Sequence, residues 1–234
     1  MADTENTFVL SLGGSLVVPN GGIDTDFLSA FNTFIRKQIT VNKRKFFIVV
    51  GGGATTRQYQ KAASVVRGQK ITDLDLDWIG LHATRLNAQL LRTILVDIAD
   101  PRVIKHYEVI LKIEKPIAIA AGWKPGWSTD YCAITLCADY GMKHIINLTN
   151  IDQVYDKDPN KFPDAKPLVD LTWKEYFPIV GDKWIPGLNM PFDPIASRLA
   201  QKLGVTVKLL NGKNLDNLSR ALDEKPFHGT TIHE

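Results

Sequence analysis

The stretch Phe-Phe-Ile-Val-Val-Gly-Gly-Gly, residues 46–53, decides the fold class. Five apolar residues without polar alternation predict a strand covered on both faces, and three glycines predict a sharp turn directly after it. The same order recurs at 8–14, where an apolar run ends in Gly13-Gly14, and at 117–122, where another ends in Gly122. Because buried strands that alternate with helices form parallel sheets, we expect an α/β fold. Its form would be a three-layer α/β/α sandwich around a mainly parallel central sheet.

Between these strands, apolar residues recur at helical spacing, which predicts helices in the connecting segments. Asp24 or Thr25 is placed to cap a helix that runs to about residue 41. Further helices are expected from 54 onward and over 74–99, 128–141, 172–180, 194–203 and 214–223, strands over 144–148, 205–210 and 229–232, and a short hairpin within 149–169. No repeat or composition shift divides the chain, so we expect one domain over 1–234 with two functional halves.

The composition excludes several classes of protein. A formal charge of +3 without a long basic run argues against nucleic-acid binding, and 44% apolar with 23% charged residues argues against disorder. No run approaches the ~18 apolar residues of a membrane span, and the first six residues lack the features of a signal peptide. We therefore expect a soluble, cytoplasmic protein. Cys132 and Cys137, about 140° apart on a predicted helix, are expected as buried apolar residues rather than a disulfide or a zinc pair.

Glycine at three strand ends predicts a site for an anion. The carboxyl ends of parallel strands meet at one edge of a sheet, where helix N-termini present free N–H groups. Glycine at such an end lets a phosphate approach the backbone. The sequence contains no P-loop, no G-x-G-x-x-G after the first strand and no G-x-S-x-G turn. A different phosphate-binding architecture is therefore required.

The order of motifs along the chain resembles the amino-acid kinase superfamily, and within it the archaeal type of UMP kinase. The resemblance is carried by LGGS at 12–15, VGGG at 50–53 with Arg57, DWIG at 77–80, GWKPGWSTD at 122–130, TNIDQVY at 149–155 with Asp158-Pro159, DPIA at 193–196 and GTTI at 229–232. It implies transfer of the ATP γ-phosphoryl group to UMP, in pyrimidine nucleotide biosynthesis. It also implies an acceptor (UMP) lobe over 1–142, an ATP-binding lobe over 143–234 and a homo-oligomer, a hexamer built from dimers.

The resemblance further implies a role for each matching residue. ATP would be held by Gly14, Ser15, Gly53, Arg57, Thr149, Asn150, Tyr155 and Asp158. UMP would be held by Gly52, Asp77, Trp123, Lys124, Pro125, Gly126, Trp127, Ser128 and Thr129, with the Asp77 carboxylate on the ribose. Arg57, Lys124 and Asp193 would be catalytic, with Asp193 orienting basic groups or metal-bound water. No resident metal site is implied, because Mg²⁺ would travel with ATP on phosphate oxygens and water.

The chain departs from the family pattern at two positions. Many members carry a lysine two residues before the first Gly-Gly turn, whereas this chain has Ser11, which cannot neutralise transition-state charge. By motif position, the cations that could replace it are Lys124, Arg57, Arg85 and Arg198. Gln153 stands where the nucleotide loop usually has glycine, and would be strained by about 1 kcal/mol if that position needs a positive φ. A different conformation of the loop would remove that strain.

Other readings of the same residues stay open. Asp158 and Asp193 both precede proline and suit ordinary turn or cap positions. A kinase of the superfamily that acts on another phosphate or on a carboxylate remains an alternative. The lack of histidine just after 51–53 argues against the isopentenyl-phosphate branch, which uses one there. A non-catalytic protein that binds a nucleotide or an oxyanion is the third possibility, and Ser11 is the feature that favours it.

Overall fold

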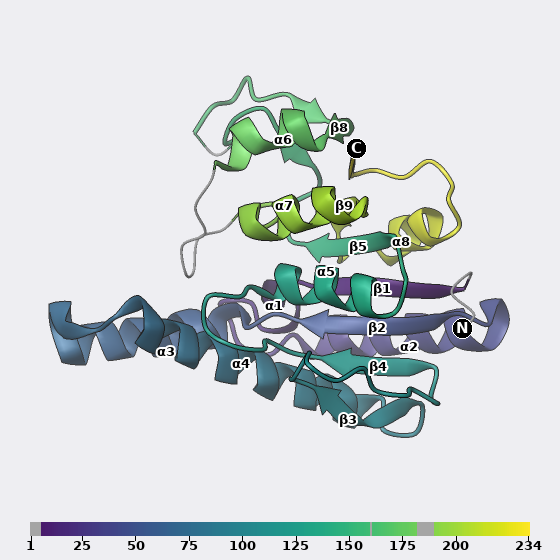
Figure 1. Cartoon of the computed structure of the whole chain (residues 1–234), viewed down its shortest axis with the longest axis horizontal. Coiled ribbons are helices and arrows are strands. Elements are labelled where there is room, and N and C mark those ends of the chain that lie inside the picture. The colour runs from purple at the N-terminus through teal and green to yellow at the C-terminus, as the bar shows by residue number, and fades with distance from the viewer. Residues whose placement is uncertain (1–5, 160, 182–189) are drawn as a thin grey trace.

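An eight-stranded, mainly parallel sheet forms the centre of the molecule (Figure 1). The computed structural model describes residues 6–159, 161–181 and 190–234. The strand order is β3-β4-β2-β1-β5-β9-β10-β8, in which β10 runs antiparallel to β9 and parallel to β8. The strands are β1 (Thr7–Leu12), β2 (Lys45–Val50), β3 (Ala99–Ile104), β4 (Ile117–Ala120), β5 (His144–Thr149), β8 (Asp170–Thr172), β9 (Thr206–Asn211) and β10 (Thr230–His233).

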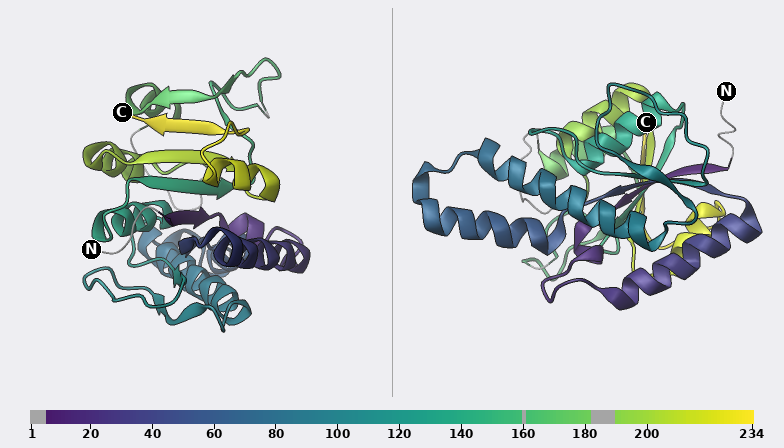
Figure 2. Two further views of the ribbon diagram at one scale, coloured as in Figure 1. Left: turned by 90° about the vertical axis from the view of Figure 1, so that its right-hand side faces the viewer. Right: turned by 90° about the horizontal axis from the view of Figure 1, so that it is seen from below.

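Helices cover both faces of this sheet, which confirms the expected three-layer sandwich (Figure 2). Successive strand residues point to opposite faces, so Val9 belongs to one apolar core and Leu10 to the other. Val9 packs with α5 (Thr129–Asp139), α6 (Trp173–Val180) and α7 (Pro194–Leu203). Leu10 packs with α1 (Gly14–Val17), α2 (Thr25–Asn42), α4 (Asp73–Ile94) and α8 (Leu215–Leu222).

The remaining long helix, α3 (Gly53–Arg67), pairs with α4 and projects with it beyond the sheet (Figures 1 and 2). A short 3₁₀ turn, Gly68–Lys70, joins the two helices. A capping box then starts α4, with Thr72 accepting from the Asp75 N–H and the Asp75 carboxylate accepting from the Thr72 N–H. This arrangement places residues 77–85 of α4 beside the strand ends.

Most predicted elements are confirmed, and a few are corrected. The helix expected over 74–99 ends at Ile94, and Ala99 already belongs to β3, a strand that was not predicted. The short α1 and the edge strand β8 were not predicted either. The expected hairpin is β6 (Val154–Tyr155) paired with β7 (Pro167–Leu168), and both cysteines are buried and free as expected.

The sequence also led us to expect neither a signal peptide nor a membrane-spanning segment. Residues 1–5, on which the signal-peptide expectation mainly rests, lie outside the described residues. Among the helices that the structure describes, none combines the length and apolar character needed to cross a membrane.

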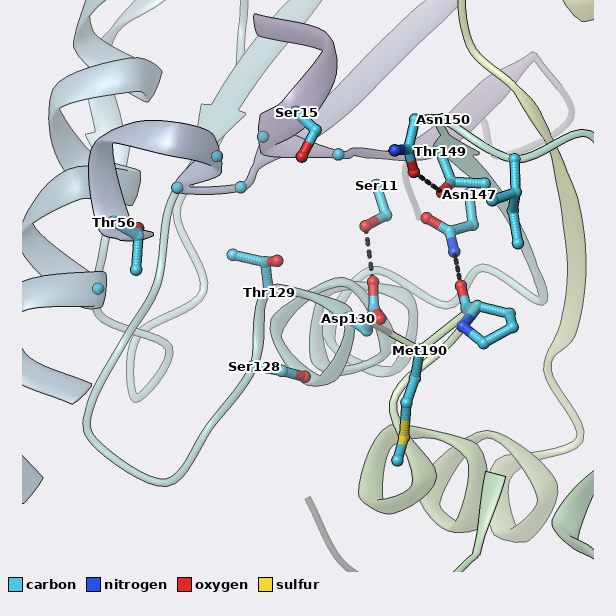
Figure 3. A pocket seen from close by; sticks show the side chains of 18 of the residues that line it. Ser11, Ser15, Thr56, Ser128, Thr129, Asp130, Asn147, Thr149, Asn150 and Met190 are labelled. Atoms are coloured by element: carbon cyan, nitrogen blue, oxygen red, sulfur yellow. Dashed lines mark hydrogen bonds between the residues drawn. The ribbon is translucent and has the colours of Figure 1, made fainter. Parts of the chain in front are cut away.

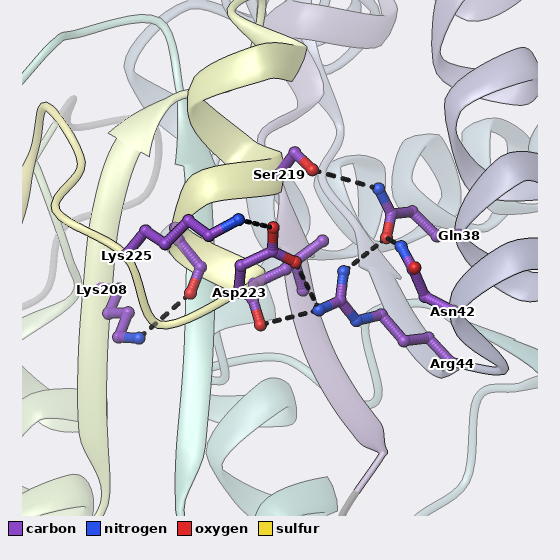
Figure 4. A network of polar contacts seen from close by, with 9 residues as sticks. Gln38, Asn42, Arg44, Lys208, Ser219, Asp223 and Lys225 are labelled. Atoms are coloured by element: carbon purple, nitrogen blue, oxygen red, sulfur yellow. Dashed lines mark hydrogen bonds and ion pairs between the residues drawn. The ribbon is translucent and has the colours of Figure 1, made fainter.

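A polar network centred on the buried Arg44 connects residues 38–44 with residues 219–225 (Figure 4). The Arg44 guanidinium donates to Gln38 Oε1 at 2.5 Å, to the Leu222 carbonyl at 3.1 Å and to Asp223 Oδ1 at 2.7 Å. Only 9% of the Arg44 side chain is exposed, against 28% for Asp223, so solvent screens this ion pair incompletely. The network joins α2 and β2 to the end of α8.

Candidate active site

A cavity of about 870 Å³ opens at the carboxyl ends of β1, β2, β4 and β5. Residues from both halves of the chain line it (Figure 3). Of the predicted site residues, all but Trp123 and Asp193 line this cavity. Because the four strands are parallel, side chains distant in sequence come together there.

The turns after β1 and β2 pack against each other backbone to backbone. The Gly51 N–H donates to the Leu12 carbonyl at 2.9 Å, and a Cβ on Gly14 would overlap backbone atoms of Gly51 and Gly53. Gly53 has a φ of +62°, which favours glycine. At Gly52, by contrast, the Thr56 side chain is the main obstacle to a Cβ. Glycine at 14, 51 and 53 is therefore required by packing of the turns, a reason independent of access for a phosphate.

Arg57 lies on α3 just beyond these turns and lines the cavity. Its guanidinium donates to Ser15 Oγ at 3.3 Å and to Asn20 Oδ1 at 3.0 Å. Both partners are neutral, so the positive charge of Arg57 is available to a bound phosphate.

The loop after β4, residues 122–128, is held by three side chains of α4. Thr84 Oγ1 accepts from the Gly122 N–H at 2.9 Å, and Arg85 donates to the Trp123 carbonyl at 2.9 Å. Asp77 Oδ2 accepts from the Gly126 N–H at 2.8 Å. Burial raises the pKa of Asp77, although this N–H opposes the shift. The predicted ribose ligand therefore also anchors the loop that is expected to cover UMP.

Aromatic residues stiffen the same loop. Trp123 lies 5.5 Å from Tyr107 and 4.4 Å from Trp127 between ring centroids, and Trp127 lies 4.1 Å from Tyr131. The Lys124 ammonium sits 4.1 Å from the centre of Trp123 and 4.7 Å from that of Trp127, in cation–π contact with both. Trp127, Lys124 and Pro125 line the cavity, whereas Trp123 supports them from behind.

The N-terminus of α5 faces the cavity through Ser128 and Thr129. Ser128 caps the helix, its Oγ accepting from the Tyr131 N–H at 3.1 Å. The first N–H groups of an 11-residue helix attract an anion. This helix end lies across the cavity from the Ser15 turn (Figure 3).

Asp193 is placed differently from its predicted catalytic role. It caps α7, with Oδ1 accepting from the Ala196 N–H at 2.6 Å, and it is only 5% exposed. Burial raises its pKa, and it does not line the cavity. Its backbone N–H instead donates to Asp130 Oδ2 at 3.1 Å. The structure therefore shows Asp193 as a helix cap, and its catalytic role stays a prediction.

Asp130 lines the cavity in its place and was not predicted. Its Oδ1 accepts from Ser11 Oγ at 2.9 Å, across from β1 (Figure 3). Burial and the nearby Asp193 carboxylate raise the pKa of Asp130 to about 7. One sequence signal marks this residue: it is the only carboxylate in the first eight residues of an otherwise largely apolar helix.

The far end of the cavity is formed by β5 and the β6–β7 hairpin. Thr149, Asn150, Tyr155 and Asp158 line this end, as does Asn147, which was not predicted. The Asn147 amide donates to the Pro191 carbonyl at 2.9 Å.

Gln153 fixes the hairpin without strain. Its Nε2 donates to the Gly229 carbonyl at 3.0 Å, while the neighbouring Val154 N–H donates to Thr230 Oγ1 at 2.9 Å. Among the described non-glycine residues, only Lys43 and Glu224 have a positive φ. The loop thus adopts a conformation in which glutamine is acceptable.

The four cations considered as substitutes for the missing lysine have separate locations. Arg57 and Lys124 line the cavity, as does Lys157, which pairs with Asp164 at 2.7 Å. Arg85 is used on the loop carbonyls. Arg198 lies over the Phe177 ring at 5.2 Å and does not line the cavity. Of the four candidates, Arg85 and Arg198 thus do not line the cavity.

Residues 6–211 match the family model described as the amino acid kinase family. The chain belongs to the amino acid kinase family. Within this family it is 34% identical over 231 residues to a uridylate kinase of Thermoplasma volcanium, covering 97% of this chain and 98% of the relative. It is 33% identical to a uridylate kinase of Methanospirillum hungatei, over 97% and 94% of the two chains.

Two solved structures have the same fold. The uridylate kinase of Archaeoglobus fulgidus superposes with a TM-score of 0.78 at 27% identity, over 97% of this chain and 99% of the other. A UMP kinase of Bacillus anthracis gives a TM-score of 0.75 over 97% and 96% of the chains, and at 17% identity this likeness concerns the fold alone.

Proposed function

We propose that this amino acid kinase transfers the γ-phosphoryl group of ATP to UMP, giving ADP and UDP for pyrimidine nucleotide synthesis. The observation that carries the proposal is the position of Asp77. Its carboxylate faces the cavity that the Gly51–53 turn and Arg57 also line. A carboxylate suits the vicinal hydroxyls of a ribose and repels a misplaced phosphate. The uridylate kinases among the relatives support the same acceptor.

In this proposal the acceptor occupies the half of the cavity built by residues 1–142. The ribose of UMP lies at Asp77, its base at Trp127, and its phosphate at Gly52 and the N-terminus of α5. ATP occupies the half built by 143–234, with adenosine between Thr149 and Asn150 at the end of β5 and the hairpin residues Tyr155 and Asp158. The triphosphate of ATP and the phosphate of UMP then meet at Gly14, Ser15, Gly53 and Arg57.

The chemistry requires positioning and neutralisation of charge more than acid or base catalysis. The UMP phosphate oxygen is already a competent nucleophile and attacks the γ-phosphorus in line with the departing ADP oxygen. The Arg57 guanidinium and the backbone N–H groups of the glycine turns would stabilise charge on the transferring group. ATP would enter as its magnesium complex, the ion held by phosphate oxygens and water.

A turnover assay tests the acceptor. With ATP and magnesium, we expect UMP to be phosphorylated at least tenfold faster in kcat/KM than AMP, GMP or a non-nucleotide phosphate. CMP is the hardest competitor, because only the base edge distinguishes it from UMP. Equal rates across the panel, or preference for a non-nucleotide, would contradict the proposal. Absence of turnover with measurable ATP binding would favour a non-catalytic nucleotide-binding protein.

We also propose that the enzyme is a cytoplasmic homo-oligomer assembled through the projecting pair of helices. Large apolar side chains are exposed on α3 and at the start of α4, namely Tyr59 at 66%, Val65 at 75%, Val66 at 89% and Leu74 at 57%. Such a cluster on one projecting element is typical of an interface between subunits. Sedimentation of the wild type and of Val66→Asp tests this: a hexamer that dissociates in the variant is expected, and a monomeric wild type would refute it.

A further inference from the structure

Ser11 and Asp130 form a hydrogen-bonded pair in the cavity to which the proposed function assigns no role. Ser11 is 3% exposed, and both side chains line the cavity at the end of β1, next to the Gly13-Gly14 turn. Ser11 Oγ and Asp130 Oδ1 are 2.9 Å apart. The other carboxylate oxygen accepts the Asp193 N–H at 3.1 Å. One oxygen of Asp130 is thus fixed by the backbone, and the other shares a hydrogen with Ser11.

The charged and titratable groups packed around Asp130 offer it no counterion. The Asp193 carboxylate faces it from α7, Tyr176 from α6, and Cys132 belongs to its own helix. Within the part of the chain that the structure describes, no lysine or arginine is among the groups that set its pKa. An ionised Asp130 would therefore stand as an uncompensated negative charge beside the phosphates of both substrates.

The protonation state of Asp130 decides what Ser11 offers to a phosphate. When Asp130 is ionised, it accepts the Ser11 hydroxyl hydrogen, and Ser11 turns a lone pair toward the cavity. When Asp130 is neutral, its own O–H donates to Ser11 Oγ, and the Ser11 hydroxyl hydrogen is free to point outward. Only the second arrangement is compatible with a phosphate oxygen near Ser11.

We propose that Asp130 works as a neutral carboxylic acid. Its O–H donates to Ser11 Oγ, and the Ser11 O–H in turn donates to a substrate phosphate at the end of β1. Asp130 is a positioning residue in this scheme, and Ser11 donates to the substrate. No proton is consumed in the phosphoryl transfer. Binding of ATP above neutral pH takes up one proton, because the bound state requires the neutral acid. This inference rests on the ATP binding that the proposed function includes, and not on the choice of UMP as acceptor.

The direction of the pH dependence follows from the raised pKa of about 7 in the free enzyme. The active, protonated form is fully present below that pH and is lost above it, so kcat/KM for ATP should fall tenfold per pH unit between about pH 7.5 and 9. Asp130→Asn keeps a donor toward Ser11 and an acceptor for the Asp193 N–H but does not titrate. We expect this variant to lose the alkaline fall.

Two further variants distinguish ionisation of Asp130 from other causes of an alkaline fall in activity. Ser11→Lys supplies a counterion that keeps Asp130 ionised, so its activity should also be flat across this range. Asp139→Asn is the matched control, because burial raises the pKa of Asp139 on the same helix, yet Asp139 does not line the cavity. It should retain the alkaline fall of the wild type. An alkaline fall that persists in Asp130→Asn would overturn the proposal.

A binding measurement tests the proton directly and does not depend on turnover. Titration of the wild type at pH 8 with the magnesium complex of a non-hydrolysable ATP analogue, repeated in buffers of different ionisation enthalpy, should show uptake approaching one proton. Asp130→Asn and Ser11→Lys should show none. No uptake by the wild type would refute the neutral-acid role. Normal uptake without phosphorylation of UMP at any pH would instead refute the proposed function and leave this inference standing.

Discussion

Asp77 gives the sharpest test of the proposed acceptor site, because its two carboxylate oxygens have different tasks. Oδ2 accepts from the Gly126 N–H at 2.8 Å, which leaves the other oxygen for the ribose of UMP. Asp77→Ala removes both contacts. A hydrogen bond to a charged group contributes about 1.5–3 kcal/mol, so KM for UMP should rise roughly tenfold to 150-fold while KM for ATP barely changes.

Asp77→Asn separates the two tasks. The amide oxygen can still accept from the Gly126 N–H, so the loop stays in place, but the NH₂ group and the lost charge weaken the contact with the ribose. We expect a rise in KM for UMP of about threefold to tenfold, equivalent to roughly 0.6–1.4 kcal/mol.

Thermal unfolding of both variants serves as the control. Gly126 is exposed, so water can replace Asp77 on its N–H, and loss of the contact should cost little stability. Moreover, burial raises the pKa of Asp77, which means that its ionised form destabilises the folded state above that pKa. Neither variant should therefore lower Tm by more than a few degrees at pH 7. An unchanged KM for UMP in folded Asp77→Ala, or an equal rise for both substrates, would refute the assignment of Asp77 to the ribose.

The other predictions concern cations. Arg57→Ala should lower kcat about 100-fold to 1000-fold, by analogy with the loss of one preorganised donor to the transition state. Arg57→Lys should restore only part of the lost activity, because a guanidinium binds two oxygens at once and an ammonium does not. A fall in kcat of less than tenfold in steady-state assays of Arg57→Ala would contradict the role of Arg57 at the phosphates. Lys124→Ala should lower kcat much less than Arg57→Ala, because the Lys124 ammonium already contacts the indole rings of Trp123 and Trp127. An equal loss in the two variants would identify Lys124 as the cation that replaces a lysine at position 11. Arg44→Ala should lower the free energy of unfolding by about 2–3 kcal/mol in denaturant titrations, because it removes three hydrogen bonds, although Asp223 keeps its pair with Lys225. Arg36→Ala, which breaks an exposed pair with Asp97, should cost less than about 1 kcal/mol, and equal effects of the two variants would contradict the reasoning.

The central layers of the fold could be predicted because their signal is local. The apolar runs before Gly13 and Gly51 determine both the strands and the turns, and Asp24 caps α2 as expected. The two missed strands lie at the edges of the sheet. β3 contains Asp100, Pro101 and Arg102. An edge strand tolerates these residues, but in the sequence they predict a loop rather than a strand. β8 has three residues and exists only because β10 pairs with it.

The site could be predicted where a motif concentrates its residues in one loop. It could not be predicted where two distant elements decide the outcome. Asp193 has the same local sequence whether it caps a helix or faces a ligand, and only the structure shows that it caps α7 and contacts Asp130 of α5. Asp130 lacks a local signal of comparable strength, because its importance depends on which residue of β1 lies opposite. Ser11 itself was identified as unusual, but its partner becomes visible only in three dimensions.

The strand order also constrains how the protein can assemble during its synthesis. Residues 7–104 and 117–120 supply the four adjacent strands β3-β4-β2-β1, and β5 and later strands are added along the edge of β1. Nascent chains begin to fold from the N-terminus, and at about 5–20 residues per second the roughly 30 residues from β4 to the end of β5 take about 1.5–6 s to emerge. During that interval the backbone of β1 is an unpaired strand edge, open to pairing with another nascent chain. Slower initiation of translation, which spaces ribosomes along the message, should therefore increase the yield of folded enzyme.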